Sequence, residues 1–404
     1  MRLLYVTGGF PWPLTSGYLR HYFLIRELAA RHDLTLLSLV GADHMPEHVE
    51  ALAEVTTGVH TFPTTSRSRS KMRKAGARLR SLTPGARAGD PAHRLGRKAA
   101  ELLAAERHDA VVFSGKRTGP ALAFLGDLPV VTDLCDATSA RIRGSLRHLG
   151  PVELPAALLD LVQVSRVERR LVERSGHVLF ASQRDLEAVL GTGPAPAATV
   201  VPNGVDTGYW QRDGASLGTD SVVFTGAMDY APNEDAARFL IAEVMPLVRQ
   251  ARPAARCSIV GRSPRPALVA AGEAAAGDGV TVTGAVPDVR PHLARASVFV
   301  APLRFGAGIQ NKVLDAMAME VPVVASPLAA EGLRAQDGAL PPLQVAEGPV
   351  ALAERIVVAL DAARLDPTPD RRARRYVETH FSWKRSGELI AHVLDDAVAK
   401  VSSR

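Results

Sequence analysis

Short apolar runs alternate along the chain with longer segments in which apolar residues recur every three or four positions. After Pro13, for example, apolar residues stand at Leu19, Phe23, Leu24 and Leu28, the spacing of one face of a helix. Short apolar runs bounded by polar turns are typical of strands buried on both faces. In the first half these runs are Leu3–Val6, Leu34–Leu39, Ala110–Phe113, Val130–Thr132, Val178–Ser182 and Thr199–Val201. The alternation predicts an α/β protein with a doubly wound parallel sheet.

A second alternation follows a polar, glycine-bearing stretch, Thr207–Asp220, that has no apolar periodicity and that we interpret as a linker. Its apolar runs are Val222–Thr225, Cys257–Gly261, Val280–Thr283, Val298–Ala301 and Val321–Ala325. We therefore predict two Rossmann-like domains, at 1–206 and 207–382. A last helix is expected after Trp383, so residues 383–404 form a third, terminal segment.

The composition is that of an ordinary soluble globular protein, with 47% apolar and 22% charged residues among 404. No apolar run approaches the roughly 20 residues that a membrane span needs. The first residues have one basic side chain and a very short apolar run, which favours a first strand over a signal peptide. Cys135 and Cys257 are too few for a disulfide framework or a zinc site. We therefore expect a cytoplasmic protein.

The formal net charge is +6, and much of the excess lies in the basic segment Arg67–Lys98, which has eleven Lys or Arg and one acid, Asp90. Aromatic residues that would stack on bases are missing from it, which disfavours nucleic acid as a partner. Two interpretations remain open. The segment is a solvated surface, or it contacts an anionic acceptor or the inner, acidic face of a membrane.

The stretch from Phe299 to Pro327 combines a strand, a glycine-containing loop, a helix from Asn311 to Met319, and another strand. Glycines let backbone N–H groups approach an anion, and a helix start favours negative charge. Lys312 adds a positive charge there, whereas Asp315 repels phosphate and is better suited to ribose hydroxyls. The pattern fits a nucleotide site, and an ordinary loop-to-helix turn is the alternative.

Two acids, Asp133 and Asp136, follow the predicted strand at Val130–Thr132. Ligands of open α/β sheets bind at the carboxyl ends of the strands, so both acids are candidate functional residues. The alternative is helix capping and surface charge.

The stretch 299–327 resembles the donor-binding signature of retaining GT-B glycosyltransferases, the large family 4-like group that includes sucrose, trehalose and mannosyl transferases. That signature has Glu, seven residues, Glu, then Ala-Met-Ala-x-Gly-x-Pro-Val. Asp315 stands at the second Glu, Ala307 at the first, and Glu320 in place of the Gly. The sequence GAGIQNKVLDAMAM is closest to a sugar-transferase branch with a Lys three residues before the second acid. The segments PNGVD at 202–206 and GAMDYAPN at 226–233 also resemble the family.

The resemblance implies that an N-terminal acceptor domain and a C-terminal donor domain face a central cleft, with the terminal helix crossing back to the first domain. The family places an Arg after Gly226 and a Lys five residues later, where this chain has Ala227 and Pro232. Lys312 is the first choice for the missing cation. Arg304 and then Arg262 are the next choices for that cation, and Asn233 is a further candidate because it lies in a loop at the carboxyl end of a strand. The remaining residues that the resemblance assigns to the donor are Gly17, Arg20, Gly226, Val286, Gly308, Ile309, Gln310 and Asp315.

In the family, a His in the loop that follows the predicted Val130–Thr132 strand contacts the transferred sugar. Asp136 is the nearest equivalent here, and the choice between Asp136 and Asp133 stays open. Together with Lys312, these two acids are the candidate catalytic residues. No cofactor and no metal is expected.

The function implied is transfer of a sugar, hexosyl in type, from a nucleoside diphosphate sugar to a hydroxyl of a small-molecule or lipid-linked acceptor, with retention. The Ala- and Arg-rich composition is typical of a GC-rich bacterial source, which fits cell-surface glycan or secondary-metabolite synthesis. Three alternatives remain: a GT-B-fold sugar-nucleotide epimerase, a pseudoglycosyltransferase, and a non-catalytic sugar-nucleotide-binding partner.

Overall fold

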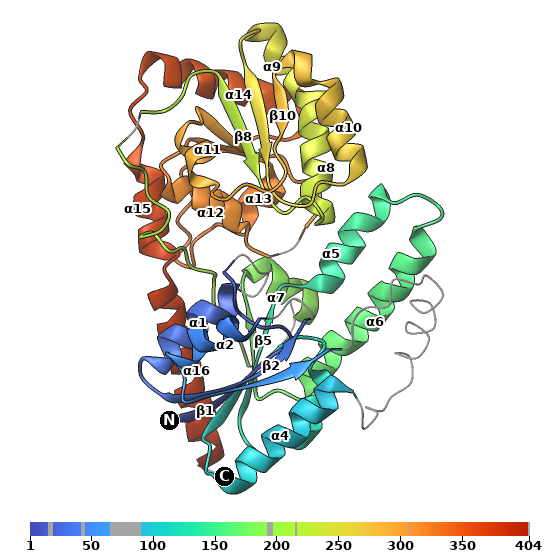
Figure 1. Cartoon of the computed structure of the whole chain (residues 1–404), viewed down its shortest axis with the longest axis vertical. Helices are drawn as coiled ribbons and strands as arrows, with labels where there is room; N and C mark the ends of the chain where they lie inside the picture. The colour runs from blue at the N-terminus through green and yellow to red at the C-terminus, as the bar shows by residue number, and fades with distance from the viewer. Residues whose placement is uncertain are drawn as a thin grey trace. The chain divides into compact units, whose positions relative to one another are not determined.

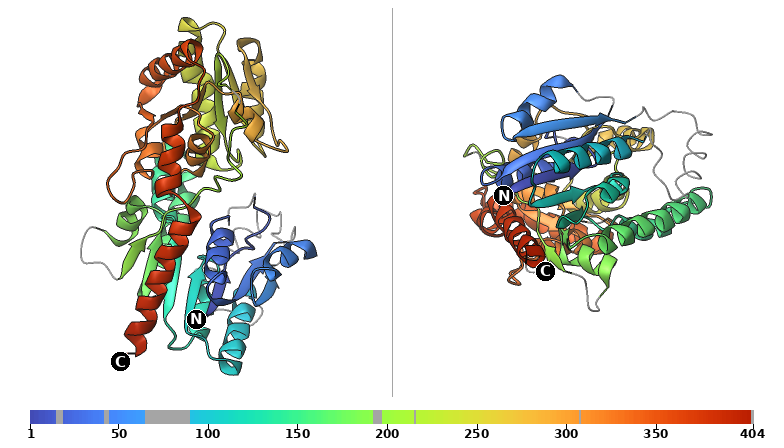
Figure 2. Two further views of the ribbon diagram at one scale, coloured as in Figure 1. Left: turned by 90° about the vertical axis from the view of Figure 1, so that its left-hand side faces the viewer. Right: turned by 90° about the horizontal axis from the view of Figure 1, so that it is seen from below.

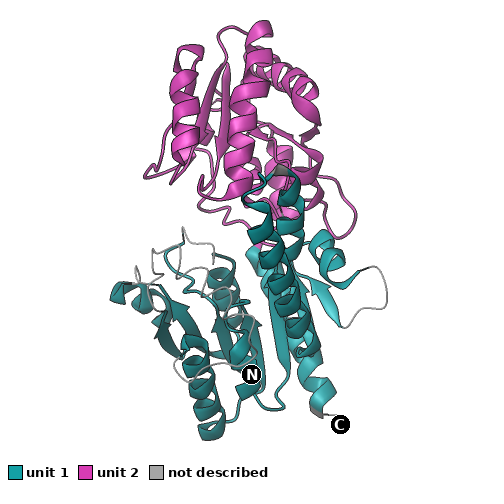
Figure 3. Cartoon of the chain, turned by 90° about the vertical axis from the view of Figure 1, so that its right-hand side faces the viewer, with its two compact units in different colours: residues 1–202, 383–404 teal, residues 203–382 magenta. Residues whose placement is uncertain are grey.

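The computed structural model describes residues 1–14, 19–41, 45–64, 90–191, 197–214, 216–306 and 308–402. The chain divides into two compact units: unit 1 comprises residues 1–202 and 383–404, and unit 2 comprises residues 203–382 (Figure 3). Each unit has its own parallel sheet between helices, and together these two Rossmann-like units define a GT-B fold (Figure 1).

Unit 1 contains a seven-stranded sheet in the order β3-β2-β1-β4-β5-β6-β7 within its described residues. All of its pairings are parallel. The strands are β1 (Arg2–Thr7), β2 (Asp33–Val40), β3 (Gly58–Pro63), β4 (Ala110–Ser114), β5 (Val130–Cys135), β6 (His177–Phe180) and β7 (Ala198–Val200). The helices are α1 (Leu19–Ala29), α2 (Pro46–Ala53), α4 (Pro91–Ala105), α5 (Thr138–Ser145), α6 (Leu154–Glu173), α7 (Gln183–Leu190) and α16 (Trp383–Ser402), with short 3-10 turns η1 (Gly119–Phe124) and η2 (Leu146–His148).

The strands of unit 1 are apolar because a hydrophobic cluster covers each face of the sheet. Alternate strand residues, such as Leu3 and Tyr5 of β1, pack with α1, α2 and α16. Their neighbours, such as Leu4 and Val6, pack with α4, η1 and α6. Because successive side chains of a strand point to opposite faces, a strand covered on both sides must be apolar throughout. The C-terminal helix α16 belongs to the first of these layers (Figure 2).

The described residues of unit 2 form a six-stranded parallel sheet in the order β10-β9-β8-β11-β12-β13. The strands are β8 (Ser221–Thr225), β9 (Arg256–Val260), β10 (Val280–Val282), β11 (Val298–Ala301), β12 (Val323–Ala325) and β13 (Gln344–Val345). The helices are α8 (Ala231–Phe239), α9 (Met245–Ala251), α10 (Pro266–Ala274), α11 (Arg290–Ala294), α12 (Asn311–Ala318), α13 (Pro327–Glu331), α14 (Gly348–Leu365) and α15 (Arg371–His380), with a π turn η3 (Leu240–Val244) and a 3-10 turn η4 (Ala276–Asp278).

In each sheet the strand order reverses direction at one point, between β1 and β4 in unit 1 and between β8 and β11 in unit 2. Loops that leave the carboxyl ends of the strands diverge there, and ligands of open α/β sheets bind in the resulting crevice. The predicted strand–loop–helix stretch is β11, its following loop and α12, which places it directly at the reversal point of unit 2. Across the described residues, no helix combines the length and the apolar character that crossing a bilayer requires.

Candidate functional site

The predicted site residues that the structure describes fall into two groups, one in each unit, along the carboxyl edges of the two sheets. Gly17 and the departure at Ala307 lie outside the described residues. The unit 1 group is Arg20, Asp133 and Asp136. The unit 2 group is Gly226, Asn233, Arg262, Val286, Arg304, Gly308, Ile309, Gln310, Lys312 and Asp315. The functional roles of these residues stay predictions.

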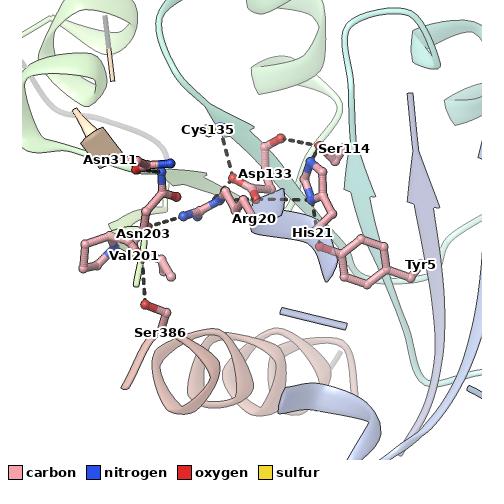
Figure 4. A network of polar contacts seen from close by, with 11 residues as sticks. Tyr5, Arg20, His21, Ser114, Asp133, Cys135, Val201, Asn203, Asn311 and Ser386 are labelled. Atoms are coloured by element: carbon pink, nitrogen blue, oxygen red, sulfur yellow. Dashed lines mark hydrogen bonds and ion pairs between the residues drawn. The ribbon is translucent and has the colours of Figure 1, made fainter. Parts of the chain in front are cut away.

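In unit 1, Arg20 of α1 and Asp133 of β5 form a buried ion pair (Figure 4). Arg20 Nε donates to Asp133 Oδ2 at 2.8 Å, and Nη2 donates to Oδ1 at 3.3 Å. Arg20 Nη1 donates to the carbonyl of Val201 at 2.8 Å, and the Cys135 N–H donates to Asp133 Oδ1 at 3.0 Å. Asp133 is only 1% exposed. These contacts give both residues a structural role that links α1, β5 and the end of β7.

His21 continues this network into the core. Its Nδ1 lies 3.0 Å from the Tyr5 hydroxyl, and its Nε2 lies 2.9 Å from Ser114 Oγ (Figure 4). The pKa of His21 is lowered to about 4, mainly by burial; Asp133 opposes this shift and Arg20 contributes to it. His21 is therefore neutral at physiological pH and serves the packing of β1 against β4.

Buried charged groups also fix the loop that follows β5. The Ala137 N–H donates to Asp185 Oδ1 at 3.0 Å, and the Ser139 N–H donates to Glu168 Oε1 at 3.3 Å. Lys116 Nζ donates to the carbonyl of Asp136 at 3.0 Å and lies 3.3 Å from Glu168 Oε1. A carboxylate or an ammonium thus holds the backbone at three successive points between Asp136 and Ser139.

Asp136 differs from Asp133 because its side chain reaches solvent. It is 36% exposed, and its Oδ1 lies 3.7 Å from Lys116 Nζ. The register of β5 against β6 shifts between Asp133 and Cys135, and Cys135 has a left-handed φ of 61°. This irregularity turns the chain so that one acid points into the core and the next lies at the surface. Asp136 is therefore the acid that a ligand can reach.

In unit 2, the turn between β8 and α8 is closely packed around Gly226. A Cβ on Gly226 would lie 2.6 Å from Asn233 Nδ2, and one on Gly261 would lie 1.7 Å from the Gly226 carbonyl oxygen. Asn233 is buried, and its Nδ2 donates to the carbonyl of Ala227 at 3.1 Å. Asn233 Oδ1 is buried without a hydrogen-bond partner among the described residues. An unsatisfied buried acceptor calls for an explanation, and a donor group of a bound ligand would supply one.

The loop between β11 and α12 brings Lys312 to the start of a helix. Gly308 has a left-handed φ of 73°, a conformation that glycine adopts without strain. Lys312 Nζ donates to Gln310 Oε1 at 3.0 Å and lies 5.8 Å from the centre of the Phe224 ring. Within the described part of the chain, no carboxylate lies at ion-pair distance from Lys312. Its charge therefore remains available to an anion.

Burial acts on both ionisable groups of α12. It lowers the pKa of Lys312 to about 8, with Asp315 opposing the shift. It raises the pKa of Asp315 to about 8, with Lys312 opposing the shift. Burial thus disfavours both the ammonium form of Lys312 and the carboxylate form of Asp315. An incoming anion would stabilise the protonated lysine.

The other two candidate cations of unit 2 are already near carboxylates. Arg304 makes a two-pronged pair with Asp235, with Nε to Oδ2 at 2.9 Å and Nη2 to Oδ1 at 2.5 Å. Arg262 Nη1 lies 4.0 Å from Asp229 Oδ2, and both side chains are largely exposed. A phosphate would have to compete with Asp235 for Arg304, so Lys312 is the best placed of the three.

Helix α12 is held at both ends by residues of the segment that opens unit 2 and of α15. At its start, Asn203 Nδ2 donates to Asn311 Oδ1 at 2.9 Å. At its end, Arg212 Nε donates to the carbonyl of Met319 at 3.0 Å, and Arg374 Nη1 donates to the carbonyl of Ala318 at 2.8 Å. Two guanidinium groups at the carbonyl end also complement the helix dipole.

Arg374 also donates to the carbonyls of Thr207 and Trp210, at 2.9 and 2.8 Å. The stretch predicted as a linker is therefore bonded into unit 2 over this part. Glu320, directly after the α12 end, has a left-handed φ of 59°. This geometry explains why a glycine suits that position of the signature.

The remaining predicted residues have less distinctive surroundings. Val286 lies half-buried in the loop after β10, and Ile309 is buried beside the α12 start. In the described ranges, no group of three or more His, Cys, Asp or Glu is arranged to hold a metal ion.

Several polar residues of the site were given no role of their own in the sequence interpretation: His21, Lys116, Glu168, Asp185, Asn203 and Asn311. All of them act through contacts between segments far apart in sequence. The only local signal was PNGVD, whose Asn203 turns out to bond to Asn311 of the signature stretch.

One family model matches part of the chain. Residues 219–362, most of unit 2, match the family model described as glycosyl transferases group 1. This range contains Gly226, Lys312 and Asp315. No curated protein gave a significant match by sequence.

Solved structures of the same fold cover nearly the whole chain. Sucrose-phosphate synthase from Thermosynechococcus elongatus is 15% identical with a TM-score of 0.65, covering 99% of this chain and 99% of that one. Anabaena Alr3699/HepE, in complex with UDP and glucose, is 15% identical with a TM-score of 0.62, covering 98% of this chain and 100% of that one. A trehalose-phosphate synthase from Burkholderia xenovorans is 11% identical with a TM-score of 0.60, covering 98% and 100%. At such identities the likeness establishes the GT-B fold.

Proposed function

We propose that the protein is a glycosyltransferase that moves a sugar from a nucleoside diphosphate sugar to an acceptor hydroxyl. The observation that carries the proposal is Lys312. It lies at the start of α12, behind a glycine loop, at the reversal point of the sheet whose residues match the glycosyl transferase family. Structures of the same fold with UDP and with UDP-glucose bound support a nucleotide-sugar donor.

In this proposal, unit 2 binds the donor. Lys312 and the backbone N–H groups of the loop ending at Gln310 hold the diphosphate, and Asp315 accepts a hydrogen bond from a ribose hydroxyl. The leaving group is a diphosphate, so catalysis consists of stabilising its developing negative charge and positioning the acceptor. Asn233 Oδ1, to which no group in the described ranges donates, accepts a hydrogen bond from the donor.

Unit 1 supplies Asp136. Its partly exposed carboxylate, on a loop anchored by hydrogen bonds to buried carboxylates, is suited to contact the sugar or to accept the proton of the acceptor hydroxyl. Asp133, enclosed by Arg20, supports that loop. The proposal includes retention of configuration, transfer of a hexose, and no metal requirement.

The broader setting that we propose is bacterial cell-surface glycan or secondary-metabolite synthesis in the cytoplasm, with a small or lipid-linked acceptor. The basic segment would hold the protein at the inner face of the membrane. Most of it, residues 67–89, lies outside the described ranges. In α4, Arg94 donates to the Pro63 carbonyl at 3.0 Å, and Lys98 lies 3.5 Å from Glu101.

The test has two stages. A thermal-shift screen of UDP, GDP, dTDP and ADP identifies the base, because a ligand at about 100 times its dissociation constant stabilises by about 2.7 kcal/mol. Release of the nucleoside diphosphate from the matching glucose donor is then measured for the wild type, for Lys312→Met and for Lys384→Met. Lys384 is an exposed lysine on α16 and serves as the matched control.

We expect release by the wild type and the control, and strongly reduced release by Lys312→Met. Binding without release or transfer would indicate a non-catalytic partner. Conversion of the donor sugar, detected by NMR, would indicate an epimerase. Equal release by Lys312→Met and the wild type would contradict the site assignment.

A further inference from the structure

Helices α5 and α6 form an antiparallel pair that projects from unit 1 (Figures 1 and 2). The C-terminal half of α6 packs against the sheet, where Glu168 and Leu171 are buried. The N-terminal half and the turn before it extend away from the sheet. We call residues 146–162 the α5–α6 tip.

The tip exposes large apolar side chains. Val152 is 92% exposed, Leu158 45% and Val162 46%. Leu158 and Val162 are four residues apart, so they lie on one stripe of α6. Elsewhere in the described part of unit 1, only Met45 and Val401 are exposed large apolar residues. The tip therefore concentrates an apolar surface that the rest of the unit avoids.

Exposed arginines lie on both helices near this apolar surface. Arg143 is in α5 and Arg147 is in η2. Arg166 and Arg169 are exposed on α6 and continue the stripe of Leu158 and Val162 toward the C-terminus.

The acids near the tip offset only part of this positive charge. Exposed Glu153 lies in the turn, where its Oε2 accepts from the Gly150 N–H at 3.3 Å. Asp160 is half-buried. Glu168 is buried beside Lys116. The outer face of the helix pair is thus apolar at the tip and positively charged around it.

We propose that the α5–α6 tip docks on the surface of an anionic lipid bilayer. Val152, Leu158 and Val162 would enter the boundary between headgroups and acyl chains, and the four arginines would contact lipid phosphates. Charge complementarity favours a bilayer over a neutral apolar partner. The inference deepens the proposed function by naming the surface that brings the enzyme to a membrane, and it does not depend on the basic segment 67–98.

Vesicle sedimentation tests the proposal with the full chain. The vesicles contain phosphatidylcholine alone or phosphatidylcholine with phosphatidylglycerol. We compare the wild type, the double variant Val152→Glu/Leu158→Glu, and the double variant Arg143→Gln/Arg147→Gln. Leu365→Glu is the matched control, because Leu365 is 88% exposed at the end of α14 in unit 2.

We expect the wild type and Leu365→Glu to bind vesicles that contain phosphatidylglycerol, and added salt to weaken this binding. The apolar double variant should bind at least tenfold more weakly, and the arginine double variant should bind several-fold more weakly. Equal binding by the apolar double variant and the wild type would overturn the proposal, as would failure of the wild type to bind. A dimer in gel filtration that becomes a monomer in the apolar double variant would also overturn the proposal. A second copy of the chain would then occupy the tip.

Nucleoside diphosphate release from a soluble donor separates this inference from the proposed function. The apolar double variant should release product at the wild-type rate, because its substitutions lie in the turn before α6 and in the first half of α6, away from the loop that carries Asp136. Vesicle binding without any release would leave the docking surface in place and contradict the proposed function. Melting temperatures within about 2 °C of the wild type check that the exposed substitutions preserve the fold.

Discussion

The two sheets of the protein end in edges of the same topology, yet their charges are arranged differently. At the edge of unit 1, Arg20 and Asp133 neutralise each other in the core. At the edge of unit 2, Lys312 has only the neutral Gln310 as its hydrogen-bond partner among the described residues. The first arrangement stabilises a fold, whereas the second leaves a cation for a ligand.

This difference distinguishes Arg20 from Lys312, two residues that have the same predicted role in the sequence alone. A charged residue after a parallel strand is a candidate for ligand binding in either unit. Arg20 and Lys312 were therefore both assigned to the donor. Burial and pairing distinguish them, because a guanidinium shared between a carboxylate and a carbonyl has little capacity left for phosphate.

The largest predicted effect is on the stability of unit 1. Arg20→Met should destabilise it by about 3–5 kcal/mol, because the substitution leaves the Asp133 carboxylate buried without its counterion. Hydrogen exchange measured on peptides of α1 and β5 should report the loss, whereas peptides of unit 2 should keep their protection. Unchanged protection combined with lost donor binding would instead favour a ligand role for Arg20.

Replacing Asp136 should affect activity, whereas replacing Asp133 should affect stability. Asp136→Asn should lower the rate of nucleoside diphosphate release by about 100-fold, as for loss of a general base, with donor affinity and melting temperature nearly unchanged. Asp133→Asn should lower the melting temperature instead. Full activity in Asp136→Asn would remove it from the catalytic residues.

Nucleoside diphosphate affinity should depend on pH through unit 2. Because the pKa of Lys312 is lowered to about 8, the ammonium that attracts the diphosphate is lost as the pH rises through that value. Ionisation of Asp315 over the same range adds repulsion. Affinity measured by calorimetry should fall by about tenfold between pH 7 and 9. In Lys312→Arg the cation does not titrate, so the decline should be smaller, and an equal decline would assign the effect elsewhere.

The smallest predicted effect concerns Glu320. Glu320→Gly should stabilise unit 2 by about 1 kcal/mol, because glycine adopts the left-handed conformation at the end of α12 without the strain of a Cβ. Glu320→Ala removes the same carboxylate but keeps the Cβ, so it should not stabilise. Chemical denaturation of the three proteins provides the comparison. If Glu320→Ala and Glu320→Gly stabilised unit 2 equally, the cause would be loss of the Glu320 carboxylate and not relief of backbone strain.

Much of the fold could be predicted from the sequence, because strands buried on both faces are continuous apolar runs. The strands at Leu3–Val6, Ala110–Phe113 and Val222–Thr225 fall within β1, β4 and β8. The half-buried β3 and the two-residue β13 carry no such signal and were not predicted.

The candidate site was predictable only where its residues are local in sequence. The glycine loop, Lys312 and Asp315 lie within one short stretch. The pairing of Arg20 with Asp133 joins residues 113 positions apart, and Asn203 meets Asn311 across 108. Without the fold, nothing in the sequence indicates that Arg20 forms a buried ion pair with Asp133.

Calorimetric titration of Lys312→Met with the nucleoside diphosphate that gives the largest thermal shift tests the central claim most directly. We predict that the dissociation constant rises by about 100-fold, equivalent to about 2.7 kcal/mol of lost charge-assisted hydrogen bonding, while Lys384→Met binds like the wild type. A dissociation constant for Lys312→Met within about twofold of the wild type would contradict the account, because the diphosphate would then be held by other groups.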